Sequence, residues 1–190
     1  MDNIRNFVTP GLWLLLVVVW GLGALNRKET QQSESTASRL LHLGLMLLSF
    51  LLTLGPWFDL GPLGYRFTPS GPGAVIVGCL IQAVGLVFAI VARTRLGRNW
   101  SGQITIKEEH QLIRQGPYAL VRHPIYTCWW FGLIGTAIVY GRWGGLLGCA
   151  IMLAAYWRKI GIEERFLVQQ FGDAYLAYRR QVKALIPFIL

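Results

Sequence analysis

The chain has 190 residues, of which 54% are hydrophobic and only 14% are charged, and its mean hydropathy is +0.45. This composition excludes an ordinary soluble domain, because several apolar runs approach the roughly 20 residues with which an α-helix crosses a bilayer. The formal net charge of +9 raises nucleic-acid binding as an alternative. On a membrane protein, however, an excess of Lys and Arg marks cytoplasmic loops. We therefore interpret the chain as a polytopic integral membrane protein.

The first half of the chain contains three apolar segments that we predict to span the membrane, at residues 9–25, 40–54 and 74–92. No small-x-small cleavage site follows the first segment, so we expect a retained helix rather than a signal peptide. The polar stretch before the second segment is predicted to be a loop. Residues 57–73, rich in Pro, Gly and aromatic side chains, are predicted to be an irregular interfacial connection.

The second half begins with the longest polar stretch, residues 93–124, which is followed by two apolar segments at 125–140 and 143–157. Only Gly141–Arg142 joins these two segments, so they must form an antiparallel helical hairpin. Five spans place the two termini on opposite sides of the membrane. An outside N-terminus leaves the large majority of Lys and Arg residues inside, as the positive-inside rule requires. The polar stretch, the tail and the C-terminus are then cytoplasmic.

The tail is charged and amphipathic, with Gly172 suited to a helix end and Asp173 to a new N-cap. We thus predict an all-α fold of about five transmembrane helices, with a C-terminal helical hairpin and a cytoplasmic amphipathic tail helix. The domain organisation is a single membrane domain, 1–190, made of a three-span part, 1–92, and a second part, 93–190, that comprises the loop 93–124, the hairpin 125–157 and the tail 158–190.

Two polar groups converge on the cytoplasmic face in this topology. Pro124 suits the first turn of a helix and pushes His123 into an extended conformation just outside it. The free N–H groups at such a helix start favour a carboxylate or another anion. Glu163 and Glu164 follow the hairpin, and adjacent side chains on a helix point about 100° apart, so at most one faces the hairpin squarely. The alternatives are interfacial anchoring by Arg122 and His123 and a solvated charged face at the two glutamates.

Other common sites have no counterpart in the sequence. Cys79, Cys128 and Cys149 lie in apolar segments without a CxxC pair or zinc-ligand spacing, which predicts buried thiols and no metal. The sequence also lacks a dinucleotide GxGxxG loop, a P-loop and a GxSxG motif.

An ordered set of short motifs resembles the isoprenylcysteine carboxyl methyltransferase family and its phospholipid methyltransferase relatives. The motifs fall within residues 93–190 and are Leu96–Gly97–x–x–Trp100–Ser101, His110–x–Leu112–Ile113, Gly116–x–Tyr118, Arg122–His123–Pro124–x–Tyr126, Glu163–Glu164 and Phe171–Gly172–x–x–Tyr175–x–x–Tyr178. The resemblance implies a helical membrane enzyme that binds S-adenosyl-L-methionine without a Rossmann fold. Carried over by position, it implies a cofactor site formed by Gln103, His110, Gln111, Leu112, Ile113, Tyr118, His123, Pro124, Ile125, Tyr126 and Glu163.

The resemblance also suggests roles in catalysis and acceptor binding. The candidate catalytic group is Arg122, His123, Glu163 and Glu164. In the eukaryotic family members an arginine four residues before the acidic position is implicated in binding the substrate carboxylate. This chain has Lys159 there, with Arg158 beside it, so we assign these two residues to substrate binding.

The expected partners are a polar cofactor from the cytoplasm and a lipophilic or lipidated acceptor from the bilayer, without nucleic acid or metal. A carboxylate acceptor, such as that of an isoprenylated cysteine, needs no general base. The first alternative is an amine acceptor of the phosphatidylethanolamine type, for which His123 or Glu164 would take the proton. The remaining alternatives are an NADPH-dependent relative of the sterol reductases, against which the short chain counts, and a non-catalytic membrane scaffold.

Overall fold

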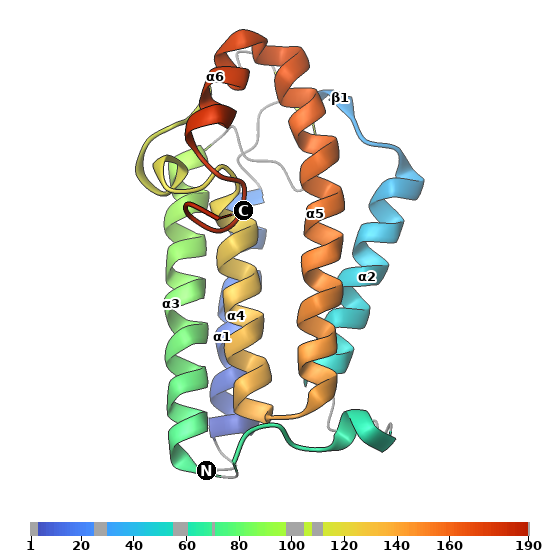
Figure 1. The fold of residues 1–190 in the computed structure, drawn as a ribbon, viewed down its shortest axis with the longest axis vertical. Helices are drawn as coiled ribbons and strands as arrows, with labels where there is room; N and C mark the ends of the chain where they lie inside the picture. The colour runs from blue at the N-terminus through green and yellow to red at the C-terminus, as the bar shows by residue number, and fades with distance from the viewer. Residues whose placement is uncertain are drawn as a thin grey trace.

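The computed structural model describes residues 4–24, 30–54, 61–69, 71–97, 105–107 and 112–189. In this part of the chain six α-helices form an elongated bundle (Figure 1). Their bounds are α1, Thr9–Ala24; α2, Thr36–Leu54; α3, Pro72–Leu96; α4, Pro124–Tyr140; α5, Trp143–Phe171; and α6, Asp173–Gln181. A π-helical turn, Ile4–Val8, precedes α1, and 3-10 turns lie at Gly61–Gly64 and Gly116–Ala119.

The apolar helices identify an integral membrane protein. By length and composition α2, α3 and α5 are long and apolar enough to cross a membrane, and Asn6–Leu22 and α4 are shorter apolar helices. Leu and Val side chains such as Leu14, Leu47, Leu80 and Val84 are exposed on the outside of the bundle, where lipid is the matching solvent. The described residues of each of the five predicted apolar segments are helical, while the number of membrane spans stays a prediction.

The last predicted apolar segment and the start of the tail belong to one helix, because α5 continues without a break from Trp143 to Phe171. The division of hairpin and tail at residue 158 stays a prediction. Ile162 and Phe166 keep apolar side chains one helical turn apart, so the charged residues between them do not end the helix. The helix ends at Gly172, whose φ of 53° is in the left-handed region that glycine tolerates. Gly172 also precedes α6 directly, which makes Asp173 the first helical residue rather than the N-cap.

The predicted all-α class is confirmed, with the addition of one short two-stranded ribbon. Strand β1, Thr30–Ser33, pairs antiparallel with strand β2, Thr105–Lys107, across the polar end of the bundle. Both segments were predicted to be loop, because strands of three or four residues, most of them polar, are too short to show an alternating pattern. The ribbon connects the segment before α2 with the polar stretch between α3 and α4.

Glycines allow the central helices to approach closely. A Cβ atom at Gly78 of α3 would lie 2.6 Å from the carbonyl oxygen of Gly135 on α4, and one at Gly85 would lie 2.7 Å from the carbonyl oxygen of Cys128. Small residues at such contacts are typical of helix pairs in membranes, where backbone packing replaces the hydrophobic driving force. This contact fixes the start of α4 relative to the end of α3.

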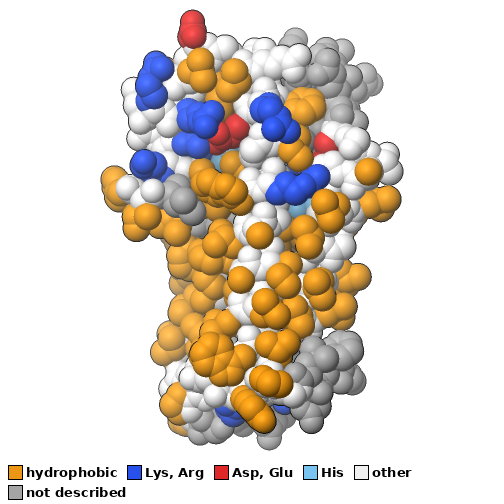
Figure 2. Space-filling view, turned by 45° about the vertical axis from the view of Figure 1, so that its right-hand side comes forward, with side chains coloured by type: hydrophobic (Ala, Val, Ile, Leu, Met, Phe, Trp, Pro, Cys, Tyr) orange, Lys and Arg blue, Asp and Glu red, His pale blue; other side chains and the backbone are white. Residues whose placement is uncertain are grey.

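Polar and apolar surfaces separate along the bundle. Lys, Arg, Asp and Glu side chains gather toward the end of the molecule that carries α6, and hydrophobic side chains cover the body below it (Figure 2). The start of α4, the C-terminal half of α5 and α6 lie toward that end, and the N-terminus lies at the other (Figure 1). The predicted convergence of the 93–124 stretch with the tail is therefore confirmed.

Candidate functional site

The segment before α4 shows the predicted helix start, but His123, with a ψ of 59°, is not in the extended conformation that was expected for the residue before a proline. Gly116, with a φ of 63°, opens the 3-10 turn Gly116–Ala119, and Tyr118 in this turn is buried. Pro124 is the first residue of α4, and His123 precedes it with a φ of −122°. The predicted helix start is confirmed, and it places Arg122 and His123 immediately before the N-terminus of α4.

The chain after α6 returns to this segment and hydrogen-bonds to its backbone. The Arg122 N–H donates to the carbonyl of Lys183 at 2.8 Å, and the His123 N–H donates to that of Ala184 at 3.0 Å. One turn into α4, the Thr127 hydroxyl donates to the carbonyl of Leu185 at 2.8 Å. The C-terminal segment therefore holds the histidine segment in place, a role that sequence reasoning missed because backbone pairing leaves no residue signal.

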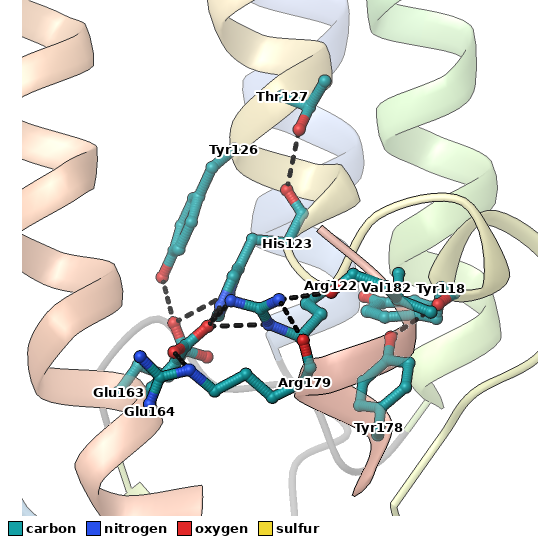
Figure 3. Close-up of polar contacts among 10 residues, drawn as sticks. All are labelled: Tyr118, Arg122, His123, Tyr126, Thr127, Glu163, Glu164, Tyr178, Arg179 and Val182. Carbon is teal, nitrogen blue, oxygen red and sulfur yellow. Dashed lines mark hydrogen bonds and ion pairs between the residues drawn. The ribbon is translucent and has the colours of Figure 1, made fainter. Parts of the chain in front are cut away.

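Glu164 is the centre of a buried ion-pair network (Figure 3). Its Oε1 accepts two hydrogen bonds from the Arg122 guanidinium, one from Nε at 2.8 Å and one from Nη2 at 2.6 Å. His123 Nε2 lies 3.3 Å from the same oxygen, and Arg179 Nε of α6 lies 3.3 Å from Oε2. The Glu164 side chain is only 8% exposed. A buried carboxylate is tolerated only with such partners, so Glu164 joins three elements through its charge.

Glu163 lies in a different environment. Its Oε2 accepts a hydrogen bond from the Tyr126 hydroxyl at 2.9 Å and lies 3.7 Å from His123 Nδ1. The side chain is 31% exposed, and it has fewer donors than its neighbour. Of the two adjacent carboxylates, Glu163 is therefore the one with room for an external hydroxyl or ammonium group.

Aromatic rings line the site between α4 and α5. The Tyr126 ring stacks on that of Tyr156 with centroids 4.8 Å apart, and the His123 ring lies parallel to Tyr126 at 5.7 Å. On the α6 side the Tyr178 hydroxyl donates to the backbone carbonyl of Tyr118. Burial raises the pKa of Tyr178 to about 12 and the pKa of Tyr118 well above its ordinary value. Both phenols are therefore hydrogen-bond donors at neutral pH.

The structure brings part of the predicted site together. Arg122, His123, Tyr126, Glu163 and Glu164 form one connected group. Of the other described members of the predicted cofactor site, Pro124 and Tyr118 are buried, and Leu112, Ile113 and Ile125 are half-buried. The remaining predicted cofactor contacts lie outside the described residues: Gln103, His110 and Gln111.

The predicted substrate residues face α2 and the segment before it. Arg158 donates a hydrogen bond to the Ser38 hydroxyl at 2.9 Å. Lys159 lies 3.8 Å from Glu34, and both of these side chains are buried. Sequence reasoning did not single out Glu34 or Ser38. The signal available was a lone carboxylate in an uncharged Gln, Ser and Thr stretch immediately before an apolar helix.

The fold and the site define an integral membrane protein with a buried, charged site at one end of an apolar helical bundle. The family model for phospholipid methyltransferases matches residues 74–174, which is more than half of the chain. The chain belongs to the phospholipid methyltransferase family. The matched region contains the whole of α4 and α5, most of α3, and the ion pair of Arg122 with Glu164.

Individual relatives carry a narrower name. The chain is 34% identical over 101 residues to the protein-S-isoprenylcysteine O-methyltransferase of Schizosaccharomyces pombe, covering 52% of this chain and 43% of the relative. It is 29% identical over 120 residues to the enzyme of that name from Saccharomyces cerevisiae, covering 60% of this chain and 49% of the relative. The matches thus span less than half the length of these relatives.

A solved structure agrees in fold. The eukaryotic intramembrane Ras methyltransferase ICMT, an isoprenylcysteine carboxyl methyltransferase, superimposes with a TM-score of 0.52 and 27% identity. The superposition covers 81% of this chain and 52% of that one. Similarity to a methyltransferase therefore extends beyond the motif-bearing half.

Proposed function

We propose that this protein is an S-adenosyl-L-methionine-dependent membrane methyltransferase whose acceptor is the carboxylate of an isoprenylated cysteine. The observation that carries the proposal is the joining of Arg122 and His123 to Glu163 and Glu164 across 40 or so residues of chain, in a family of methyltransferases. The names of the relatives support the carboxylate acceptor.

The residues present fit S-adenosyl-L-methionine. That molecule carries a carboxylate, an ammonium group, a ribose diol and a flat adenine. Glu163 offers a partly exposed carboxylate oxygen for the diol or the ammonium. The first turn of α4 offers backbone N–H groups without acceptors in the helix, which suit a carboxylate. Tyr118, Leu112 and Ile113 provide apolar and aromatic surface for a flat ring.

The cofactor supplies, when bound, an electrophilic methyl group on a sulfonium. The protein's own work is then positioning and the exclusion of water, because methyl transfer is an in-line displacement. Glu163 orients the cofactor, and His123 stands between the two glutamates. Arg122 and Glu164 neutralise each other in an ion pair, so they act as positioning residues that hold the segment before α4 against α5. Lys159 and Arg158 receive the acceptor carboxylate, which needs no general base.

The orientation that we propose is cytoplasmic for the polar end and the C-terminus. The polar end contains Arg114, Arg122, Arg158 and Arg179. Arg66 and Arg142, whose backbones form a β-bridge, lie at the opposite end of the bundle. In membrane proteins the end that carries the excess of Lys and Arg faces the cytoplasm. A lipid tail of the acceptor would enter sideways from the bilayer and meet the cofactor at this level.

A phospholipid amine is the second candidate acceptor. It is favoured by one observation, the family model itself, whose description names phospholipid methyltransferases. In that case His123 or Glu164 would have to take a proton from the amine. Glu164 already accepts from Arg122 and contacts Arg179 and His123, which argues against it as a base.

The first test is calorimetric titration of the purified protein with S-adenosylhomocysteine. We expect binding in the wild type and at least about tenfold weaker binding in Glu163→Gln, because a charge-assisted hydrogen bond to the ligand is lost. Asp173→Asn is the matched control: it removes one exposed negative charge at the same end of the molecule. Equal affinity in all three proteins would refute the cofactor site.

The second test compares methyl acceptors. Labelled methyl transfer to an S-farnesylated N-acetylcysteine and to phosphatidylethanolamine in vesicles should favour the prenylcysteine. Transfer to the phospholipid alone would replace the proposed acceptor with an amine. Tight binding of NADPH without binding of S-adenosylhomocysteine would refute the methyltransferase altogether.

A further inference from the structure

A second buried polar cluster lies on the α2 side of α5, beside the ion-pair network but separate from it. Lys159 Nζ lies 3.8 Å from Glu34 Oε1, and these side chains are 8% and 2% exposed. Glu34 Oε2 accepts a hydrogen bond from the Ser38 hydroxyl at 2.7 Å, and that hydroxyl accepts one from Arg158 at 2.9 Å. A carboxylate from a distant segment thus contacts Lys159 directly and Arg158 through the Ser38 hydroxyl.

The contact between Glu34 and Lys159 is loose on its lysine side. Glu34 Oε1 is buried and has no hydrogen-bond partner among the residues that the structure describes. At 3.8 Å the two charges attract each other without a hydrogen bond, whereas a closed charge-assisted pair lies about 1 Å nearer. A buried acceptor left unsatisfied is costly, so this pair is a weak competitor for any better-placed carboxylate.

The position of the pair relates it to the candidate active site. Lys159 lies one helical turn before Glu163, so the two side chains share a face of α5. The Tyr156 ring, on the same helix, stacks on Tyr126, whose hydroxyl donates to Glu163. The Glu34–Lys159 pair therefore adjoins the place where an acceptor would meet the cofactor.

The backbone position of Glu34 allows its side chain to be displaced. It lies on the two-residue link between strand β1, which ends at Ser33, and α2, which begins at Thr36. Neither regular element contains it, so a change of its backbone dihedrals breaks no helix or strand hydrogen bond. Lys159, in contrast, is fixed within the long helix α5.

We propose that Glu34 occupies the acceptor-carboxylate position beside Lys159 and is displaced when the acceptor binds. Glu34 is then a specificity-determining residue: it neutralises Lys159 in the free protein and competes with the incoming carboxylate. This inference rests on the proposed assignment of Lys159 to the acceptor. It predicts that removing the charge of Glu34 strengthens binding of a carboxylate ligand, the reverse of what loss of a binding residue would do.

The test measures binding of two probes to the full-length protein saturated with S-adenosylhomocysteine. One probe is an S-farnesylated N-acetylcysteine, and the other is its carboxamide, which lacks the charge. We expect Glu34→Gln to bind the carboxylate probe roughly tenfold tighter than the wild type, because a like charge has been removed. The carboxamide should bind both proteins equally. Glutamine keeps the size of the side chain and an oxygen for Ser38.

Two controls separate local charge from other effects. Asp173→Asn removes an exposed negative charge from the same end and should leave the ratio of the two probe affinities unchanged. Lys159→Gln should abolish the preference for carboxylate over carboxamide. An unchanged or reduced carboxylate affinity in Glu34→Gln would overturn the inference, as would absence of probe binding in every variant. Failure of the proposed function is read separately, from the titration of the wild type with S-adenosylhomocysteine.

Discussion

Glu163 and Glu164 are adjacent in the chain, yet the structure gives them different tasks. Glu164 accepts two hydrogen bonds from Arg122 and reaches Arg179, with an exposed fraction of 8%. Glu163 has the Tyr126 hydroxyl and a longer contact to His123, with 31% exposed. The Glu164 carboxylate is occupied by ion pairs within the protein, whereas the Glu163 carboxylate remains available to a ligand. The two should therefore respond differently to the same substitution.

Glu164→Gln should destabilise the protein strongly. The substitution leaves the buried Arg122 guanidinium without its counter-ion, and breaking a buried pair in this way costs about 3 kcal/mol of the free energy of unfolding. Thermal unfolding in detergent measures the loss. Glu163→Gln is the paired control and should change stability by less than about 1 kcal/mol. Equal losses in the two variants would contradict the division of roles.

At the scale of single elements, α3 and α4 depend on glycine for their close approach. A Cβ atom at Gly135 would lie 2.5 Å from the backbone nitrogen of Gln82 and from the carbonyl oxygen of Gly78. Both of these are backbone atoms, so a side-chain rotation cannot relieve the overlap. The helices would have to separate, and the start of α4, which carries His123, would move with them.

Gly135→Ala should therefore lower the free energy of unfolding by about 2 kcal/mol or more, as overpacked cores do. The matched control is Gly44→Ala in α2, where an added Cβ meets nothing within 4 Å. There alanine should be neutral or stabilising by up to about 1 kcal/mol, because it favours the helix. Thermal unfolding of the two variants decides the matter, and similar melting temperatures would show that the seam tolerates a side chain.

The C-terminal segment is the second element with a testable role. Its carbonyls at Lys183, Ala184 and Leu185 accept hydrogen bonds from Arg122, His123 and Thr127. A chain that stops after Gln181 loses all three and should bind S-adenosylhomocysteine at least about tenfold more weakly. A chain that stops after Pro187 keeps them and should bind normally, since Phe188 and Ile189 are exposed. Normal binding by the shorter chain would exclude the role.

At the scale of the whole molecule, charge is unequally distributed between the two ends of an apolar bundle (Figure 2). Apolar side chains on the outside of the helices match the bilayer, and the candidate site lies at the charged end. For the methyltransferase that we propose, this arrangement would let a soluble cofactor and a lipid-borne acceptor reach the same site from different phases. It requires that the charged end face the compartment that contains the cofactor.

The orientation can be measured with a thiol reagent that does not cross membranes. Tyr65→Cys places a thiol at an exposed position at one end of the bundle, and Arg180→Cys does so at the other. In intact cells we expect labelling of the first variant only, because positive loops face the cytoplasm. The unsubstituted chain controls for its own three cysteines, and both variants should react after lysis. Labelling of Arg180→Cys alone would reverse the topology.

How far the sequence predicts this protein depends on the range of the interaction involved. Hydropathy predicted five apolar helices, and the pairing of Pro124 with His123 predicted the start of α4, because both depend on neighbouring residues. The continuity of α5 through residue 158 was not predicted, because the hairpin and the tail were divided where the charged residues begin. The ribbon of β1 and β2 was not predicted, because its strands have only four and three residues and most of these are polar.

The sequence by itself determined the membrane class, the helices and the set of candidate charged residues, since hydropathy and helical period are local properties of the chain. Only the tertiary structure decided which glutamate is buried and which is open, since burial depends on the elements packed around α5. The same holds for the return of residues 183–185 to Arg122 and for the placement of Glu34 beside Lys159. Backbone hydrogen bonds and ion pairs between distant segments depend on how the helices pack, and no single stretch of residues specifies that packing.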